Sequence, residues 1–163
     1  MGALIDGKAI AAGIREDVAK EVAALKSEHG FTPGLAVVLV GEDPASQIYV
    51  RNKGKMTEEA GMNSFTHRLP ADATQDQVEA LLETLNNDDS VDGILLQLPL
   101  PKHLDEASAI ERISPNKDVD GLTEASAGRL SLGKKGIRPC TPAGCVVLAK
   151  SALGDDLSGK NVV

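Results

Sequence analysis

Apolar residues recur along the chain at two spacings, and each spacing predicts a different kind of secondary structure. Unbroken aliphatic runs at residues 35–40 and 91–98 are typical of buried strands, and residues 63–69 alternate as a less buried strand does. Elsewhere apolar residues lie three or four positions apart, which places them on one face of a helix. The predicted helices follow five N-terminal caps, namely Asp6, Asp43, Thr74, Asp105 and Thr141.

The order of these elements predicts an α/β fold. Helices and strands alternate, which is typical of a parallel sheet, and the aliphatic run at 91–98 indicates that helices cover both faces. We therefore expect a three-layer domain. Residues 123–139 contain several glycines and predict a mostly irregular connection. After the helix capped by Thr141, with Pro142 at its first position, residues 157–163 look like the first strand of another domain.

Composition and charge narrow the classes of function. Of the 163 residues, 42% are apolar and 25% are charged, which is the balance of a globular protein. The formal net charge of −7 disfavours nucleic acid and anionic membranes as main partners. Cys140 and Cys145 form neither a disulfide framework nor a CxxC motif, so reduced thiols in the cytoplasm are expected. No signal peptide or membrane-length apolar run is visible, which favours the same location.

One stripe of the helix after Asp43 carries chemically useful side chains. Ser46, Tyr49 and Lys53 share one face, near the strand-to-helix turn where open α/β sheets bind ligands. Such a stripe is more often ordinary helix surface, but Tyr49 is the only tyrosine in a chain without tryptophan. Gln97 interrupts an aliphatic run near its end. Its amide either satisfies a loop backbone or reaches Lys53, because the ends of parallel strands meet at one edge of the sheet.

Two carboxylates, Asp118 and Asp120, flank one valine in the loop at residues 114–122. An Asp-x-Asp pair can bind a metal ion, but this loop lacks the glycine and the distal glutamate of a calcium loop. A turn or a hydrogen bond to a substrate is therefore the favoured role of these carboxylates, and no metal is expected.

Four motifs occur together in one order along the chain. Gly41–Ser46 leads into Tyr49-x-x-x-Lys53, and the other three are Gln97–Pro101, Lys117–Gly121 and Pro139–Pro142. Together they resemble the family of bifunctional methylenetetrahydrofolate dehydrogenase/methenyltetrahydrofolate cyclohydrolases over essentially the whole chain. The resemblance implies a catalytic, folate-binding α/β domain at 1–139, followed at 140–163 by a linker helix and the first strand of a truncated Rossmann domain for NADP. It also implies tetrahydrofolate derivatives as substrates and a homodimer.

The same resemblance implies roles for particular residues. Lys53 resembles the catalytic lysine of the family, Gln97 the amide that holds it, and Tyr49 the catalytic-site aromatic ring that packs against the folate. Asp120 resembles the carboxylate that anchors the pterin ring. The NADP site is expected beyond Val163, because the phosphate loop of the family follows there. The residues that resemble the remaining folate-lining positions are Leu98, Pro99 and Val119.

The implied activity is NADP-dependent oxidation of 5,10-methylenetetrahydrofolate to the 5,10-methenyl cation, followed by hydrolysis to 10-formyltetrahydrofolate. Water addition needs proton transfer, which a neutral lysine amine can supply, and a neighbouring cation favours that neutral form. The main alternative is an isolated, non-catalytic domain for folate binding or dimerisation. Short-chain dehydrogenases also use Tyr-x-x-x-Lys, but the turn at Gly41–Asp43 is not their glycine-rich loop. A Schiff-base lyase would need a carbonyl substrate, to which nothing else in the sequence points.

Overall fold

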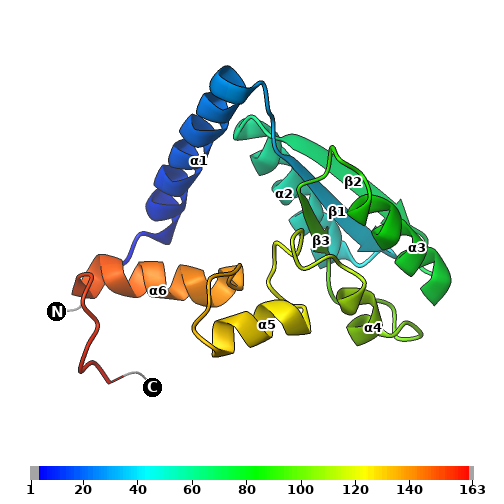
Figure 1. The fold of residues 1–163 in the computed structure, drawn as a ribbon. Coiled ribbons are helices and arrows are strands. Elements are labelled where there is room, and N and C mark those ends of the chain that lie inside the picture. Colours follow the sequence, from blue (N-terminus) through cyan, green and yellow to red (C-terminus); the bar gives the residue numbers. More distant parts are fainter. Residues whose placement is uncertain (1–3, 162–163) are drawn as a thin grey trace.

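The computed structural model describes residues 4–161, which form a parallel sheet with helices on both faces and two further helices beside it (Figure 1). Helices and strands alternate up to the third strand, as predicted, and the second half of the chain is helical with loops. The elements in chain order are α1 (Gly7–His29), β1 (Gly34–Val40), α2 (Pro44–Glu59), β2 (Asn63–Leu69), α3 (Gln75–Asn86), β3 (Gly93–Leu96), α4 (Glu106–Glu111), α5 (Glu124–Ser131) and α6 (Cys140–Leu153).

Four of the five predicted caps begin a helix. Each accepts a hydrogen bond from the backbone N–H three residues further on, which satisfies a donor that the helix itself leaves unpaired. Thr74 also forms a capping box with Gln77, in which each side chain accepts from the backbone of the other residue. The confirmed caps are Asp6, Asp43, Thr74 and Asp105.

All three strands are parallel, in the order β2–β1–β3. β1 lies in the centre and pairs with β2 along its whole length. β3 covers only Gly93–Leu96, so the strand predicted over 91–98 is too long at both ends. The chain leaves the sheet toward Pro99, which has no N–H for a strand ladder. The Gln97 N–H still donates to the carbonyl oxygen of Val38 at 2.8 Å and holds this exit against β1.

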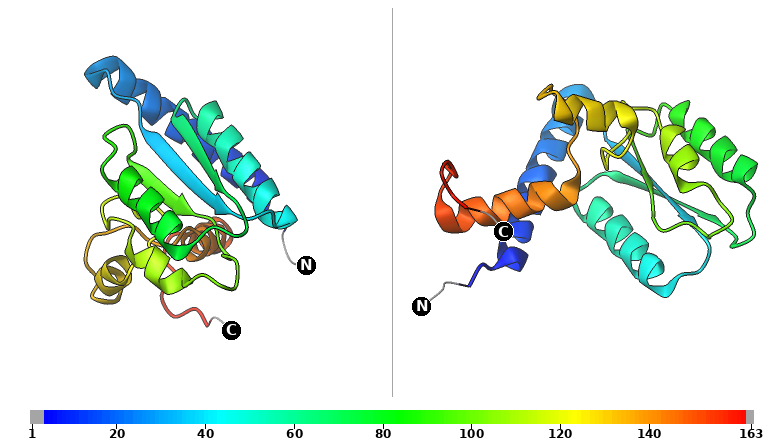
Figure 2. Two further views of the ribbon diagram at one scale, coloured as in Figure 1. Left: turned by 90° about the vertical axis from the view of Figure 1, so that its right-hand side faces the viewer. Right: turned by 90° about the horizontal axis from the view of Figure 1, so that it is seen from below.

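Alternate residues of β1 point to opposite faces of the sheet, and each face has its own apolar core. Val38 lies in the larger core, which includes Leu82 of α3 and Ala109 of α4. Val37 points the other way and packs with Val50 of α2. Figure 2 shows the sheet between α2 on one side and α3 and α4 on the other. The predicted three-layer α/β arrangement is therefore confirmed.

The stretch at 123–139 is irregular only in part, because the prediction missed one helix. It contains α5, which spans Glu124–Ser131. The Thr123 side chain caps this helix by accepting from the Ser126 N–H at 3.3 Å, and Glu124 adds a negative charge to its first turn. Of the glycines that suggested a loop, Gly128 lies inside α5, where it costs the helix about 1 kcal/mol, and these start signals offset that cost.

The end of the described chain also differs from the prediction. α6 begins at Cys140 after Pro139, so Thr141 lies inside the helix and does not cap it. A proline is accepted anywhere in the first turn of a helix, so Pro142 did not define the start uniquely. Residues 157–161 form a turn, where a strand was expected, and no strand of the described chain lies beside them to pair with. The last two residues of that predicted strand, 162–163, lie outside the described residues.

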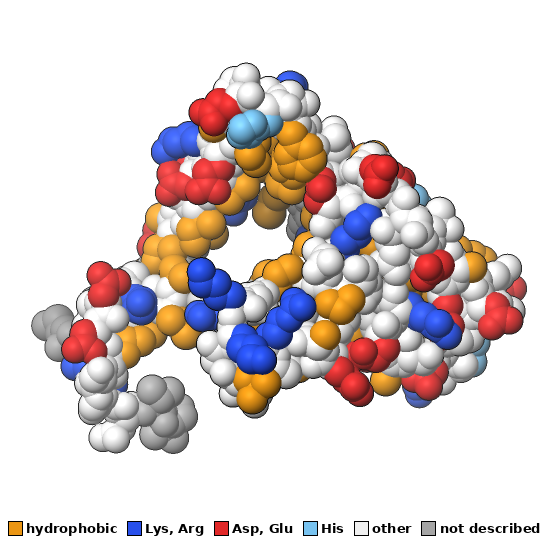
Figure 3. All heavy atoms as spheres, viewed as in Figure 1, with side chains coloured by type: hydrophobic (Ala, Val, Ile, Leu, Met, Phe, Trp, Pro, Cys, Tyr) orange, Lys and Arg blue, Asp and Glu red, His pale blue; other side chains and the backbone are white. Residues whose placement is uncertain are grey.

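Helices α1 and α6 extend beside the sheet layers and meet near the start of α1 (Figures 1 and 2). The apolar stripe predicted on α1 exists, but Val22 is the one buried residue of that helix, and α6 has none. Figure 3 shows an opening between these two helices and the sheet layers. Across residues 4–161, no helix combines the length and the apolar character that a membrane span requires.

Candidate active site

The centre of the site is a hydrogen bond between an amine and an amide. Lys53 lies on the face of α2 that looks toward β3, and its Nζ donates to Gln97 Oε1 at 3.1 Å. The Gln97 Nε2 donates to the Leu98 carbonyl oxygen at 2.7 Å, so the amide oxygen is left to face the lysine. The contact between Lys53 and Gln97, one of two roles that the sequence offered for this amide, is therefore present.

A loop on the other side of β3 brings a carboxylate toward this pair. Its first residue, Lys117, accepts from the Ile94 N–H at 2.7 Å, which attaches the loop to β3. The Lys117 ammonium donates to the carbonyl oxygen of Leu85, at the end of α3, at 3.1 Å and to that of Asp88, just beyond the helix, at 2.8 Å. Ionic hydrogen bonds of this kind are stronger than neutral ones, so this end of the loop is firmly held.

Gly93 makes room for the next part of the loop. A Cβ atom built on Gly93 would overlap the Cγ1 atom of Val119, which occupies the space that a side chain would fill. Val119 packs partly buried on the α2 face of the sheet, beside Leu95. The loop therefore lies close against β3, and Asp120 follows directly at the cleft.

The pKa of the Asp120 carboxyl group is raised above its ordinary value. Burial raises the pKa of its carboxyl group, and the nearby Asp118 carboxylate raises it further, while the Lys53 ammonium acts in the opposite direction. The amine of Lys53 and this carboxylate line the same cleft. A carboxylate that is buried without full compensation is typical of ligand-binding sites.

These side chains open into a cleft of about 930 Å³. This volume lies within the range of small-molecule sites, and most of the lining is apolar. Lys53 and Asp120 supply the charges of the cleft. The other lining residues are Val18, Leu35, Met56, Thr57, Met62, Leu95, Val119, Leu122, Pro139, Cys140 and Thr141. The arrangement suits a flat, largely apolar ligand whose edge carries N–H donors for a carboxylate.

Four of the sequence-predicted residues lie outside the cleft lining. Gln97 is one of them, and it reaches the cleft through its hydrogen bond with Lys53. Tyr49 is one turn before Lys53 on α2, but its side chain is 59% exposed. Leu98 packs against the core on the α3 face and offers the site only its carbonyl oxygen. Pro99 is exposed. The structure thus brings together Lys53, Gln97, Val119 and Asp120, while Tyr49 borders them from α2.

Asp118 is a residue of the site for which sequence reasoning proposed no individual role. Its side chain is buried and accepts hydrogen bonds from the backbone and hydroxyl of Thr123. The signal was present, because an aspartate a few residues before a threonine can close a loop through its carboxylate. The sequence did not reveal which of the two carboxylates, Asp118 or Asp120, would be turned inward.

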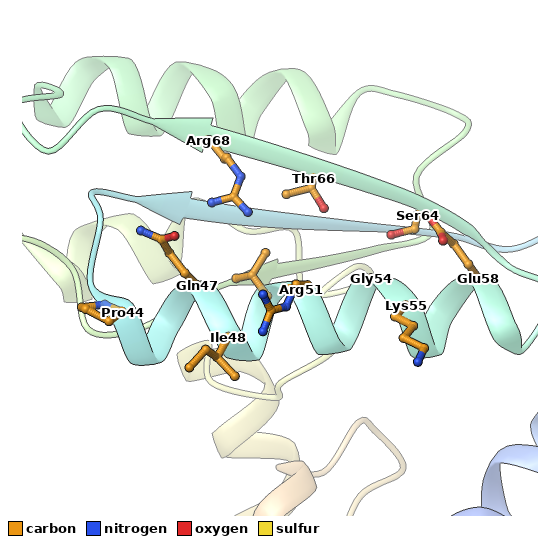
Figure 4. A pocket seen from close by; sticks show the side chains of 11 residues that line it. Pro44, Gln47, Ile48, Arg51, Gly54, Lys55, Glu58, Ser64, Thr66 and Arg68 are labelled. Carbon is orange, nitrogen blue, oxygen red and sulfur yellow. The ribbon is translucent and has the colours of Figure 1, made fainter.

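A second groove, of about 890 Å³, lies on the opposite side of α2, between that helix and β2 (Figure 4). Arg51, Gly54 and Lys55 of α2 and Arg68 of β2 line it, and its charged side chains are exposed. It contains none of the predicted site residues, so the chemistry described above belongs to the cleft beside β3. Within residues 4–161, no three metal-ligating side chains of His, Cys, Asp or Glu gather together.

Fold and cleft together define an α/β domain with a small-molecule site beside its third strand. Residues 5–120 match the sequence pattern of the tetrahydrofolate dehydrogenase/cyclohydrolase catalytic domain. This match covers most of the chain, and the chain therefore belongs to that family.

Individual relatives agree with this placement. The chain is 69% identical over 159 residues to a bifunctional protein FolD of Hyphomonas neptunium, covering 98% of this chain and 52% of the relative. The crystal structure of the bifunctional FolD dehydrogenase/cyclohydrolase of Campylobacter jejuni superposes with a TM-score of 0.90 at 46% identity, covering 94% of this chain and 54% of that one. A Trypanosoma brucei relative, solved with NADP cofactor and inhibitor, gives a TM-score of 0.90 at 35% identity, covering 98% and 54%. The chain thus spans about half the length of the relatives it matches.

Proposed function

We propose that this chain is the folate-binding part of a methylenetetrahydrofolate dehydrogenase/methenyltetrahydrofolate cyclohydrolase. In this proposal its own residues carry out the hydrolytic step, the conversion of 5,10-methenyltetrahydrofolate to 10-formyltetrahydrofolate. The observation that carries the proposal is the hydrogen bond of 3.1 Å between Lys53 Nζ and Gln97 Oε1, in a cleft shared with Asp120. The homodimer and the cytoplasmic location implied by the family resemblance belong to the same proposal.

Each polar group of the cleft has a task in this reaction. Water attacks the methenyl carbon, the bond from that carbon to one ring nitrogen breaks, and the formyl group stays on the other nitrogen. One proton of the water ends on the freed nitrogen and the second is released. The neutral amine of Lys53 accepts a proton from the attacking water and, once protonated, returns it to the freed nitrogen. Gln97 directs this amine at the reacting carbon. Asp120 accepts two N–H hydrogen bonds from the edge of the pterin ring.

Apolar walls and an exposed ring complete the fit. Val119 and Leu95 offer flat, apolar surface beside the charged pair, so the ligand can shed water there. In this proposal the exposed ring of Tyr49, one turn before Lys53 on α2, stacks on the aromatic part of the substrate.

The described residues do not fit a dinucleotide. The turn after β1 carries the carboxylates of Glu42 and Asp43, where a diphosphate would require backbone N–H groups and glycines. The Asp43 carboxylate already accepts from the Ser46 N–H at 2.8 Å, so this helix start is occupied by a negative group. NADP is therefore not assigned to residues 4–161.

The proposal is tested by the hydrolysis of 5,10-methenyltetrahydrofolate in the absence of NADP. We expect the chain to accelerate the loss of the methenyl chromophore, and Lys53→Met to reduce that acceleration by about 10²–10⁴-fold, the range of general acid–base catalysis. Lys55→Met is the matched control. Lys55 lies on the same helix, in the groove on its other side, and its change is expected to leave the rate unaltered.

The same assay separates the enzyme from a non-catalytic folate-binding domain. Saturable binding without turnover would favour the binding domain and contradict the hydrolytic step. A Lys53→Met variant that hydrolyses at the normal rate would contradict the role of the lysine. Thermal melting of both variants checks that the loss of activity is not a loss of folding.

A further inference from the structure

The loop that carries Asp120 is closed by its other carboxylate. Asp118 is 1% exposed and accepts three hydrogen bonds from residues that follow it. Its Oδ1 accepts from the Leu122 N–H at 3.1 Å. Its Oδ2 accepts from the N–H and the hydroxyl of Thr123, at 3.0 and 2.8 Å. Asp120 lies between the two ends of this closure.

These contacts require a carboxylate and not merely a polar side chain. Three donors converge on two oxygens, and an ionised carboxylate offers acceptors only, whereas an amide would turn its NH₂ group against one donor. Burial opposes ionisation of Asp118, but the hydrogen bonds from Thr123 and Leu122 outweigh it and lower the pKa of the carboxyl group, and the nearby Ser126 hydroxyl acts in the same direction. Asp118 is therefore ionised at neutral pH.

The closure is rigid because both ends of the loop are attached elsewhere. Asp118 forms a parallel bridge with Ile94 of β3 at one end. At the other end, Thr123 begins α5. Gly121 completes the bend with a φ of 65°, a value that glycine adopts without strain. The position of the Asp120 backbone follows from these attachments and not from any contact of its own side chain.

We propose that Asp118 is a positioning residue for Asp120: by closing the loop from 118 to 123 it places the Asp120 carboxylate in the cleft, facing Lys53. This inference rests on the proposed function, since it gives Asp120 the task of anchoring a pterin ring. Asp118 itself is not among the residues that line the cleft. It affects ligand binding indirectly, because it determines the position of the Asp120 carboxylate and the charge beside it.

The negative charge of Asp118 also affects the pKa of the Asp120 carboxyl group. A residue that only closed the loop would leave that pKa unchanged. Asp120 faces the Lys53 ammonium, the Asp118 carboxylate and, at the rim of the cleft, the Cys140 thiol. Asp118 raises the pKa of the Asp120 carboxyl group. Removing that negative charge therefore lowers the pKa, and the pH below which Asp120 loses its acceptor form moves to a lower value.

The test compares wild-type protein with Asp118→Asn. Folic acid serves as the pterin probe, and its affinity is measured by calorimetry between pH 4 and pH 8. We expect binding to weaken about tenfold at pH 7, the scale of one charge-assisted hydrogen bond. The acid limb of the affinity profile is expected to shift to lower pH. In the unliganded protein, NMR titration of the Asp120 carboxyl carbon is expected to show the same downward shift.

Asp92→Asn is the matched control. The Asp92 carboxylate also ties a loop to the sheet, because it accepts from the Gly34 N–H at 2.8 Å, but it lies outside the cleft lining. We expect this variant to bind folic acid with wild-type affinity and with an unshifted acid limb. Equal effects of the two substitutions would overturn the proposal, since any loosened loop would then suffice.

A second pair of variants covers the case in which Asp118→Asn does not fold. Thr123→Ala removes the hydroxyl that donates to Asp118 at 2.8 Å, and Thr123→Ser keeps it. We expect Thr123→Ala to weaken folic acid binding about threefold and Thr123→Ser to restore it. Wild-type affinity in both would overturn the proposal.

The remaining outcomes are also decisive. Weaker binding by Asp118→Asn without any shift of the Asp120 titration would make Asp118 a structural residue alone and overturn the proposal. Wild-type protein that does not bind folic acid would defeat the proposed function instead. The NMR titration of unliganded protein would still decide whether Asp118 acts on Asp120.

Discussion

Helices with the same apolar periodicity bury their apolar side chains in the sheet layers but leave them exposed in the pair α1 and α6. In the sheet layers, Leu82 of α3 is 0% exposed and lies in the larger core. In the pair, Leu153 at the end of α6 is 53% exposed, and Ile14 of α1 is 49% exposed. Both regions have helical spacing of apolar residues. The comparison teaches that periodicity predicts a helix and its apolar face, while burial depends on whether another surface covers that face.

The contacts between the two regions are few and local. Val22 of α1 lies against Gly61, where a Cβ atom would approach its Cγ1 atom to 3.5 Å. Within the pair itself, a Cβ atom on Gly7 at the start of α1 would approach the Cδ2 atom of Leu148 of α6 to 3.6 Å. Stability should therefore be concentrated in the sheet layers. Two substitution pairs test this contrast, and a third prediction concerns the cleft at the edge of the sheet.

The largest expected effect comes from removing the same side chain in each region. Leu82→Ala should lower the free energy of unfolding by about 2–5 kcal/mol, because it leaves a cavity in a closed core. Leu153→Ala should change it by about 0.5 kcal/mol or less, because that side chain already meets water. Urea denaturation of both variants measures the two values. Similar losses would break the comparison and show that α6 is as firmly packed as α3.

An intermediate effect is expected from the helix starts. Thr74→Ala removes a capping box and should cost about 1 kcal/mol. Thr141→Ala should cost far less, because no side chain caps α6. Thermal melting and helical circular dichroism read out both changes. A large loss at Thr141 would mean that the helix starts there in solution, as the sequence had predicted.

The smallest effect on the free energy of unfolding is expected at the cleft. There the ionised Asp120 carboxylate serves ligand binding but lowers the stability of the fold. Because burial raises the pKa of Asp120 above its ordinary 3.8, the folded protein binds the proton more tightly than the unfolded chain does. Ionising Asp120 therefore costs stability as the pH rises through this region. Asp120→Asn should be more stable than wild type at pH 7, with a smaller difference at pH 4. Urea denaturation at both pH values checks the sign, and a less stable variant at pH 7 would contradict it.

Sequence reasoning reached the parts of the molecule whose signals are local. The aliphatic run of β1 and the Asp43–Pro44 start of α2 each define one structure, because burial and backbone chemistry agree there. The place of Gln97 against Lys53 could be offered as one of two readings, since the ends of parallel strands share an edge.

Other parts depend on contacts between distant residues, which local patterns do not contain. α5 is short and its start is defined by Thr123, whose hydroxyl also serves Asp118. Leu98 follows Gln97 directly, yet its side chain turns to the opposite face of the sheet and into the larger core. Outside regular structure no period determines which way a residue points, so the lining of the cleft could not be deduced in full.

The close contact between Gly93 and Val119 should make these two positions vary together in evolution. Val119 fills the volume that a side chain at 93 would need, so neither position can grow alone. A library that varies one of them should accept almost nothing, whereas paired exchanges that conserve total volume should survive. In a chimaera built from this chain and a relative, residues 93 and 119 should therefore come from the same parent protein.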